Sequence, residues 1–162
     1  MSASGTKPGH DQMQPAAKMN RSERQGATTR ARSSYAIDTA RRCVVVSFTA
    51  TLAFDDIEQY ASHLRRDPRF DPGFSEIVDL RGVDNVVLNP KELTRLADRV
   101  DPFELRSKRA FVVQSQGQIH AAHIHRILRP NSSNIRVFVS MDEANDWIGA
   151  DTLRAEISRC GR

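Results

Sequence analysis

Short apolar runs that alternate with helix-like segments constrain the fold of this 162-residue chain more than any other feature of its sequence. Three runs are continuously apolar: Val44-Val45-Val46, Ile77-Val78 and Phe111-Val112-Val113. Such runs are typical of strands in a sheet that is covered on both faces. The predicted strands are Tyr35–Asp38, Cys43–Thr49, Glu76–Leu80, Ala110–Gln114 and Ile135–Val139.

Apolar side chains between these strands recur with the spacing of a helix. In the first predicted helix they fall at i, i+3, i+4 and i+7, namely Ile57, Tyr60, Ala61 and Leu64. Asp55, with Glu58 three residues later, predicts a capping box for this helix. The second helix has the strongest start in the chain, Asn89-Pro90-Lys91-Glu92, in which Asn caps and Pro suits the first position.

Two further helices are predicted in the last third of the chain. One follows Ser115 and ends before Pro130, and the other begins at Ser140 and continues after Gly149 as a segment from Asp151 to Arg159. Because strands that are separated by helices need crossover connections, the pattern predicts an α/β fold. We expect a mixed, mostly parallel five-stranded sheet flanked by four to five helices, with the first strand as an antiparallel hairpin edge.

The basic residues divide the chain into two parts. Residues 1–34 contain six basic and two acidic side chains and so carry the whole net charge of +4, whereas residues 35–162 are neutral. The first segment has few large apolar residues and no periodicity, so we predict a disordered basic tail over 1–34 and one α/β domain over 35–162. We expect no nucleic-acid partner except through the tail, because a basic footprint would have to lie on the folded surface.

The sequence also suggests a cellular compartment. It has no run of about 18 apolar residues, so no transmembrane segment is predicted. The N-terminus lacks the apolar core of a secretory signal, so we expect a cytoplasmic protein. Cys43 and Cys160 look like two isolated, reduced thiols.

Several short motifs in a fixed order resemble the bacterial SpoIIAA-like family. They are Asp67-Pro68-Arg69-Phe70-Asp71-Pro72-Gly73-Phe74, Ile77-Val78-Asp79-Leu80-Arg81-Gly82-Val83, Arg109-Ala110-Phe111-Val112-Val113, Val137-Phe138 and Asp142-Glu143-Ala144 with Trp147. The resemblance covers about residues 35 to 149 and implies a STAS-like or SEC14-like α/β domain with no settled activity.

The chain departs from that family at two places. STAS regulators carry a phosphorylated Ser or Thr at the start of the helix that here begins at Asn89-Pro90, and no hydroxyl residue lies between Asp79 and Leu93. The phosphorylation switch is therefore not implied for this chain. Relatives tend to have a Gly and an Arg near the positions of His120 and His123, so a role of that Arg is not carried over.

The carboxyl ends of the predicted parallel strands supply the first candidate ligand-binding residues. Asp79 and Arg81 follow one strand, and Ser115 and Gly117 follow the next. In open α/β sheets ligands collect at such ends, where helix N-termini present free N–H groups. The alternative is structural: Asp79 and Arg81 pair with each other, and Ser115 and Ser140 only cap helices.

Three histidines in one predicted helix supply the other candidates. At about 100° per residue, His120 falls at the centre of the face made by Ile124 and Ile127, so we expect His120 to be buried and His125 exposed. His120 and His123 complete the candidate ligand-binding set. We predict no metal site, because the helical zinc pair is separated by four residues and needs further ligands.

No catalytic motif or cofactor fingerprint occurs, so we predict neither an enzyme nor a cofactor. The leading hypothesis is a non-catalytic regulatory or protein-interaction module with a protein partner. The alternative is a small-molecule or lipid carrier, which predicts a cavity of at least about 300 Å³ near Asp79, Arg81 and Ser115. A nucleic-acid binder acting through the tail is a third hypothesis, and a homodimer is left open.

Overall fold

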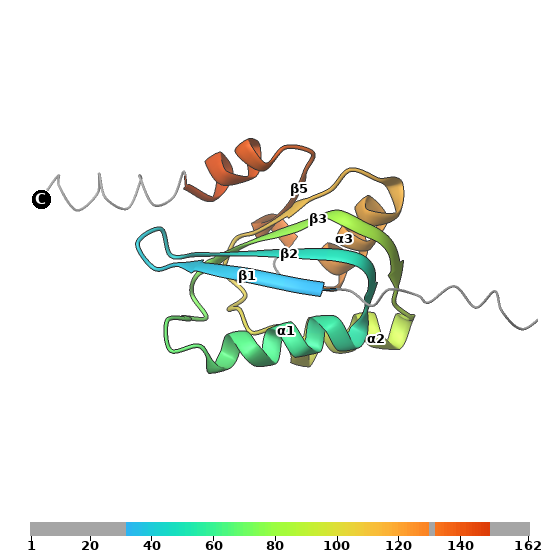
Figure 1. The fold of residues 1–162 in the computed structure, drawn as a ribbon, viewed down its shortest axis with the longest axis horizontal. Coiled ribbons are helices and arrows are strands. Elements are labelled where there is room, and N and C mark those ends of the chain that lie inside the picture. Colours follow the sequence, from blue (N-terminus) through green and yellow to red (C-terminus); the bar gives the residue numbers. More distant parts are fainter. Residues whose placement is uncertain (1–31, 130–131, 150–162) are drawn as a thin grey trace, which may run out of the picture.

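The computed structural model describes residues 32–129 and 132–149 (Figure 1). The strands are β1 (Arg32–Asp38), β2 (Cys43–Ala53), β3 (Ser75–Val87), β4 (Arg109–Val112) and β5 (Ile135–Phe138). The helices are α1 (Phe54–Arg66), α2 (Pro90–Arg95), the π-helix η1 (Leu96–Val100), α3 (Gln116–Leu128), the short 3-10 helix η2 (Ser132–Asn134) and a helix over residues 141–149.

This order confirms the predicted alternation of strands and helices. β1 begins at Arg32, three residues before the predicted strand and inside the range predicted for the tail. Residues 1–31, and the helix predicted from Asp151 to Arg159, lie outside the described residues.

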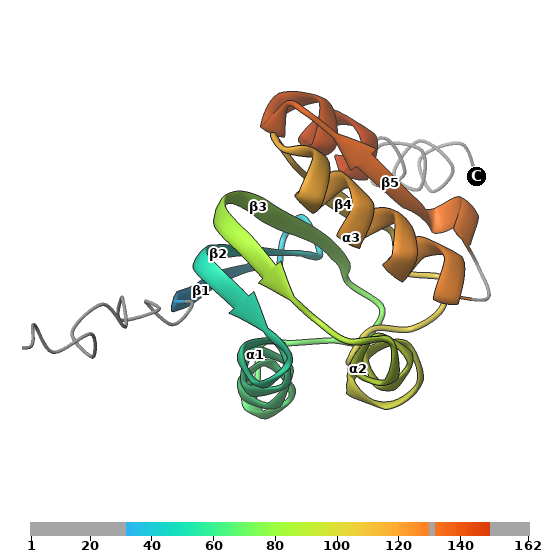
Figure 2. The ribbon, with the colours of Figure 1, turned by 90° about the vertical axis from the view of Figure 1, so that its right-hand side faces the viewer.

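The five strands form one mixed sheet in the order β1-β2-β3-β4-β5 (Figure 2). β1 pairs antiparallel with β2, and all other neighbours are parallel, which confirms the predicted topology. Each parallel pair is joined by a segment that contains a helix, as the crossover argument requires. The sheet is therefore a consequence of the alternating pattern in the sequence.

Alternate residues of each central strand enter different cores. Val44, Val46 and Phe48 of β2 belong to the core covered by α1 and α3, whereas Cys43 packs with Ala144 and Ile148 of the helix over 141–149. Figure 2 shows α1 and α2 on one side of the sheet and the last helix on the other. Burial on both faces is the reason that these strands read as continuous apolar runs.

β2 and β3 are longer than predicted and carry an irregularity in their pairing. They end at Ala53 and Val87, and their register shifts between Ser47 and Thr49. At this point Gly82 approaches β2 so closely that an added Cβ would lie 2.9 Å from Cγ2 of Thr49 and 3.0 Å from the carbonyl oxygen of Phe48. A glycine is needed there because the two backbones leave no room for a side chain.

Three of the four predicted helix caps are confirmed. Oδ1 of Asn89 accepts the amide of Glu92 at 3.0 Å, and Oγ of Ser115 accepts the amide of Gln118 at 3.3 Å. Oγ of Ser140 accepts the amide of Asp142 at 3.2 Å, so this hydroxyl caps the helix over 141–149.

The cap predicted for α1 was wrong by two residues, because the N-cap is Ala53 and not Asp55. The helix begins at Phe54, and the backbone N–H of Ala53 donates to Oδ2 of Asp56 at 3.0 Å. Asp55 and Asp56 both lie in the first turn, where a carboxylate is favoured, so the sequence alone does not separate the two registers.

Candidate functional site

A buried ion pair between two neighbouring strands lies at the centre of the candidate site. Glu76 of β3 and Arg109 of β4 are partners in the parallel register, so their side chains start side by side. Nε of Arg109 lies 2.6 Å from Oε2 of Glu76, and the two side chains are only 7% and 4% exposed. Removing two charges from water is costly, and such groups persist only when each has good partners.

Two further charged side chains complete the cluster. Asp101, directly after η1, receives Arg109 with both oxygens: Nη1 to Oδ2 at 2.5 Å and Nη2 to Oδ1 at 2.6 Å. Nη1 of Arg129, at the end of α3, lies 2.8 Å from Oδ2 of Asp101. The two arginines and two carboxylates balance in charge, which is the condition for keeping all four inside the protein.

Two neutral side chains border this cluster. Oη of Tyr60 in α1 donates to Oε1 of Glu76 at 2.7 Å. Nε2 of His125 in α3 lies 2.9 Å from Nη1 of Arg109, and its ring packs edge-on against Phe111 with centroids 5.4 Å apart. Because the arginine has only donors, Nε2 of His125 must accept, so the ring proton sits on Nδ1. The cluster thus links β3, β4, α1, α3 and the end of η1.

The pKa values follow from burial and from these contacts. Burial, aided by Arg109, lowers the pKa of His125 to about 3, so the ring is neutral at pH 7. Burial and the charge of Glu76 raise the pKa of Tyr60 well above its usual range. Burial alone would raise the pKa of Asp101, but Arg109 and Arg129 hold it below its ordinary value. Burial raises the pKa of Glu76, and Arg109 opposes that change.

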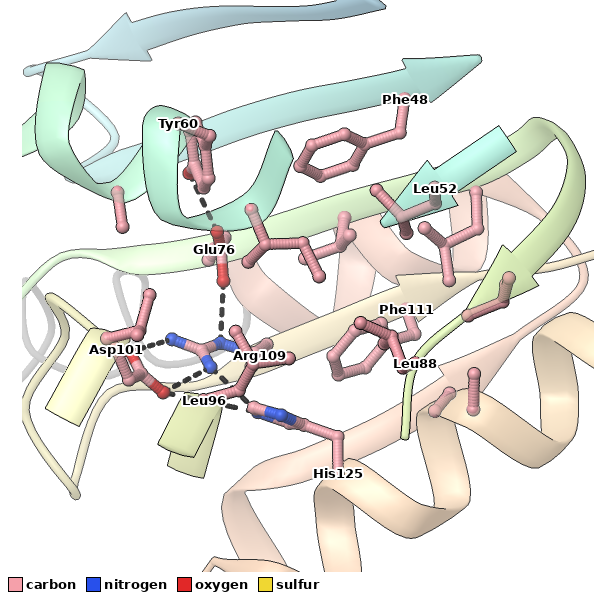
Figure 3. A pocket seen from close by; sticks show the side chains of 18 of the residues that line it. Phe48, Leu52, Tyr60, Glu76, Leu88, Leu96, Asp101, Arg109, Phe111 and His125 are labelled. Atoms are coloured by element: carbon pink, nitrogen blue, oxygen red, sulfur yellow. Dashed lines mark hydrogen bonds and ion pairs between the residues drawn. The ribbon is translucent and has the colours of Figure 1, made fainter. Parts of the chain in front are cut away.

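An apolar cavity of about 100 Å³ lies between this cluster and the helices α1, α2 and α3. Glu76, Asp101, Arg109 and His125 lie toward one end, and Phe48, Leu52 and Leu88 lie toward the other (Figure 3). Most of the remaining wall consists of aliphatic side chains: Ile57, Val78, Leu80, Val86, Leu93, Leu96 and Val100. The cavity therefore offers mostly apolar contacts, with polar groups at a single end.

A second cavity of about 240 Å³ adjoins the first one. The two share Val86, Leu88, Leu93 and Ala121 in their walls. The polar residues of the second cavity come from the end of β3 and the start of α3: Asp84, Asn85, Ser115, Gln118 and His120. The two adjoining cavities, together called the hollow, place apolar walls in the interior and polar residues at the carboxyl ends of β3 and β4.

Asp79 and Arg81 do not contribute to either cavity. They lie within β3, which continues to Val87 instead of ending at Leu80. Nε and Nη2 of Arg81 donate to the two oxygens of Asp79 at 3.0 and 2.9 Å, and Nε2 of Gln114 donates to the backbone carbonyl of Arg81. These two residues pair with each other, as the structural alternative stated, and they lie apart from the hollow.

The structure brings three of the other candidates together. Ser115, Gly117 and His120 all line the second cavity, at the place where the strand-end argument expected a ligand. Ser115 is at the same time the N-cap of α3, as the structural alternative stated. His123 is exposed and lines neither cavity.

The predicted inward face of α3 was wrong. His120 is exposed and His125 faces the interior, the reverse of the expectation. Ile127, which was taken as part of the buried face, is 79% exposed. The inward residues are Gln118, Ala122, His125 and Arg129, which repeat at i, i+4, i+7 and i+11. The helix presents polar side chains inward because they bond to Asp101, Arg109 and the carbonyl oxygen of Val83.

The charged cluster was missed by sequence reasoning, although two signals pointed to it. Glu76 and Arg109 each stand at the edge of an apolar strand run, where a charge is unexpected. The predicted parallel order made these two strands candidates for neighbours, and a register that aligns the edges of both runs pairs the two charges. Asp101 and Arg129 lie outside any motif, so only the folded chain reveals them.

The described residues, 32–129 and 132–149, contain neither a metal-binding cluster nor a helix that could span a membrane. No group of three or more His, Cys, Asp or Glu side chains lies close enough to hold a metal ion. No helix in this part of the chain is long and apolar enough to cross a membrane.

Fold and site together define a small α/β protein with a mixed five-stranded sheet, a buried charge cluster and two adjoining cavities. No protein-family model matches the chain, and no curated protein matches it. Among solved structures, the chain is similar to an uncharacterized protein of the DUF3478 family with a SpoIIAA-like fold from Shewanella loihica PV-4. The TM-score is 0.49 at 18% identity, covering 73% of this chain and 94% of that one.

The chain is also similar to an anti-sigma factor antagonist from Mycobacterium paratuberculosis. The TM-score is 0.49 at 15% identity, and the match covers 72% of this chain and 94% of that one.

Proposed function

We propose that this domain is a non-catalytic module that binds a small molecule with an apolar part and a polar part. The observation that carries the proposal is that two cavities adjoin, one with mostly apolar walls and one with several polar side chains in its wall. The apolar cavity lies against the charge cluster, and it shares Leu88 and Leu93 with a cavity whose wall contains Ser115 and His120. Pockets with apolar walls and a few convergent polar groups are the usual form of small-molecule sites.

The size of the apolar cavity restricts what it accepts. In another protein, an apolar cavity of about 150 Å³ binds benzene. A cavity of about 100 Å³ is smaller, so it accepts at most one ring or a short branched chain. It is smaller than the 300 Å³ or so expected for a complete ligand site, so a larger ligand must extend into the polar cavity.

The bonding of the charge cluster supports a non-catalytic role. Both oxygens of Glu76 and both oxygens of Asp101 already accept hydrogen bonds or ion pairs from the protein. Nε2 of His125, which would have to accept a proton in general-base catalysis, faces Arg109 instead of the cavity space. These groups therefore hold the end of the cavity in shape.

The proposal is tested by following backbone amide shifts of the full chain by NMR during titration with benzyl alcohol. This probe carries one ring and one hydroxyl, so it matches both parts of the hollow. We expect saturable shifts at β3 and α3. Leu93→Trp places a larger side chain in the wall that both cavities share, so it should abolish these shifts. The matched control, Leu105→Trp, changes an exposed leucine outside both cavities and should leave the titration as it is. Shifts that are absent in the wild type, or equal in both variants, would reject the proposal.

A regulatory protein-interaction module is the second candidate function, and a specific observation favours it. Ile127 of α3 and Val139, directly after β5, are 79% and 72% exposed, so both apolar side chains are accessible to a partner. We expect affinity capture from the native cell to return one specific protein with the wild-type chain and to lose it with Ile127→Asp. A capture that returns no specific protein, or one that Ile127→Asp leaves unchanged, would remove this candidate.

A further inference from the structure

β1 is the longer of the two outermost strands of the sheet, and its outer edge has no strand partner in the described part of the chain. β1 spans seven residues, Arg32–Asp38, and bonds to β2 on one side only. Figure 2 shows it at the border of the sheet, away from the helix over 141–149. The opposite border, β5, has only four residues. Every second N–H and C=O group of β1 therefore points away from the sheet without a strand partner.

The sequence of β1 carries none of the usual protections against pairing at an edge. The five inner residues, Ser33 to Ile37, include no charge and no proline. The pairing with β2 is regular from one end to the other, so no bulge twists the edge away. Natural proteins normally interrupt long edges with such features. A regular edge without them is suited to accept another strand.

We propose that this edge pairs with β1 of a second copy of this chain, antiparallel and centred on Tyr35. This register places Arg32 opposite Asp38 of the partner subunit, and Asp38 opposite Arg32 of the partner subunit. Two ion pairs then close the ladder at its ends. A twofold arrangement of this kind uses the same surface on both copies, so it forms a closed dimer and not a fibre.

Arg32 and Asp38, at the two ends of β1, are placed to form these ion pairs. Arg32 and Asp38 are separated by six positions, so their side chains lie on the same face of the strand. Both are exposed, and within residues 32–129 and 132–149 the guanidinium of Arg32 has no ion pair. Asp38 uses Oδ1 to accept the amide of Arg41, which leaves Oδ2 for a partner.

Charge complementarity selects the register. Shifting the two copies by two residues would place Arg32 opposite Ala36 of the partner subunit and remove both ion pairs. Shifting by one residue would turn the partner's side chains to the wrong face of the joined sheet. The centred register is thus the one in which every charged residue of β1 meets its opposite.

The test is sedimentation equilibrium of the full chain over a wide concentration range. We expect a reversible dimer. Arg32→Asp places like charges opposite each other twice, and it should raise the dissociation constant at least about tenfold. The double variant Arg32→Asp with Asp38→Arg exchanges the two charges and should restore the dimer. The control Arg106→Asp changes an exposed arginine elsewhere and should have no effect.

Three results would overturn the proposal: a monomer at all concentrations, a dimer that Arg32→Asp leaves unchanged, or a folded double variant that does not recover. Circular dichroism establishes that each variant is folded. As a measurement without mutation, hydrogen exchange of the amides from Ser33 to Ile37 should slow as the wild-type concentration rises. Exchange in β1 that is independent of concentration would also contradict the dimer.

Discussion

Arg109 is the central residue of the buried charge cluster. It bonds to Glu76 through Nε and to Asp101 through both terminal nitrogens, and it is almost completely buried. Replacing it with methionine keeps an unbranched apolar stem but removes the guanidinium, which leaves two carboxylates without their main partner. We therefore expect Arg109→Met to lower the free energy of unfolding by about 3–5 kcal/mol. Urea denaturation at pH 7 measures this change.

An exposed arginine provides the comparison for Arg109. Nε of Arg106 lies 2.6 Å from Oε2 of Glu104, but the Arg106 side chain is 82% exposed. Arg106→Met should cost only about 0–1 kcal/mol, because water replaces the lost partner. If the two substitutions proved equally mild, the buried cluster would not have the structural role assigned to it.

The neutral state of His125 makes the stability of the domain depend on pH. Its pKa is about 3 in the folded protein, against about 6.5 in an unfolded chain. The unfolded state therefore takes up a proton first as the pH falls below about 6.5, and the stability that this group contributes is lost toward pH 3. The expected slope is about 1.4 kcal/mol per pH unit for this single group.

His125→Phe should remove that slope between about pH 6 and pH 4, because phenylalanine does not titrate. The lowered pKa of Asp101 affects stability only below about pH 4, and the raised pKa of Glu76 contributes in both proteins, so the difference between the two slopes belongs to His125. The measurement is the free energy of unfolding in urea at several pH values for both proteins. Equal slopes for the wild type and the variant would show that His125 is not held neutral by its surroundings.

At the residue scale, the sequence predicts partners that are local and misses those that are distant. The Asp79–Arg81 pair spans two residues of one strand, and the cap at Ser115 spans three residues, so both could be anticipated. The inward face of α3 could not, because the largest apolar side chains are not those that turn inward. His125 faces the interior because it contacts Arg109, a residue 16 positions away in sequence.

At the scale of single elements, replacing either of two glycines with alanine should have opposite effects on stability. In β3, a methyl group at Gly82 would press against Thr49 and the backbone of Phe48. Gly82→Ala should therefore destabilise the domain by about 1–3 kcal/mol, as overpacked sites do. In α3, a Cβ at Gly117 meets nothing within 4 Å, so Gly117→Ala should stabilise by up to about 1 kcal/mol.

Thermal unfolding of both alanine variants beside the wild type measures this contrast. The melting temperature should fall for the strand variant and stay level or rise for the helix variant. A rise for Gly82→Ala would mean that β2 and β3 are farther apart at the register shift than described.

Element types were predictable because each depends on its own residues. Asn89 and Glu92 form the cap of α2 within four positions, and the apolar runs define the cores of the strands. Element lengths were less predictable. β3 continues seven residues past Leu80, through the polar residues Arg81, Asp84 and Asn85, because β2 continues beside it. Pairing with a neighbour, and not local composition, sets that end.

The topology of the whole molecule was predictable because crossover connections allow few arrangements. One antiparallel edge strand followed by four parallel strands was expected and is observed. The cavities were predictable only in part. Ser115 was expected at a ligand site, but the apolar hollow depends on how α1, α2 and α3 pack together over the sheet. No short sequence motif indicates how these helices pack.

The central claim is that the two adjoining cavities bind a small molecule. Native mass spectrometry of the full chain, purified from its own host, tests it most directly. We predict that the wild-type protein retains a bound small molecule and that Leu93→Trp, purified in the same way, does not. Leu93 is suited to this comparison because it lines both cavities and α2 has no buried residue. A spectrum with only the mass of the polypeptide, or the same bound mass on both proteins, would contradict the claim.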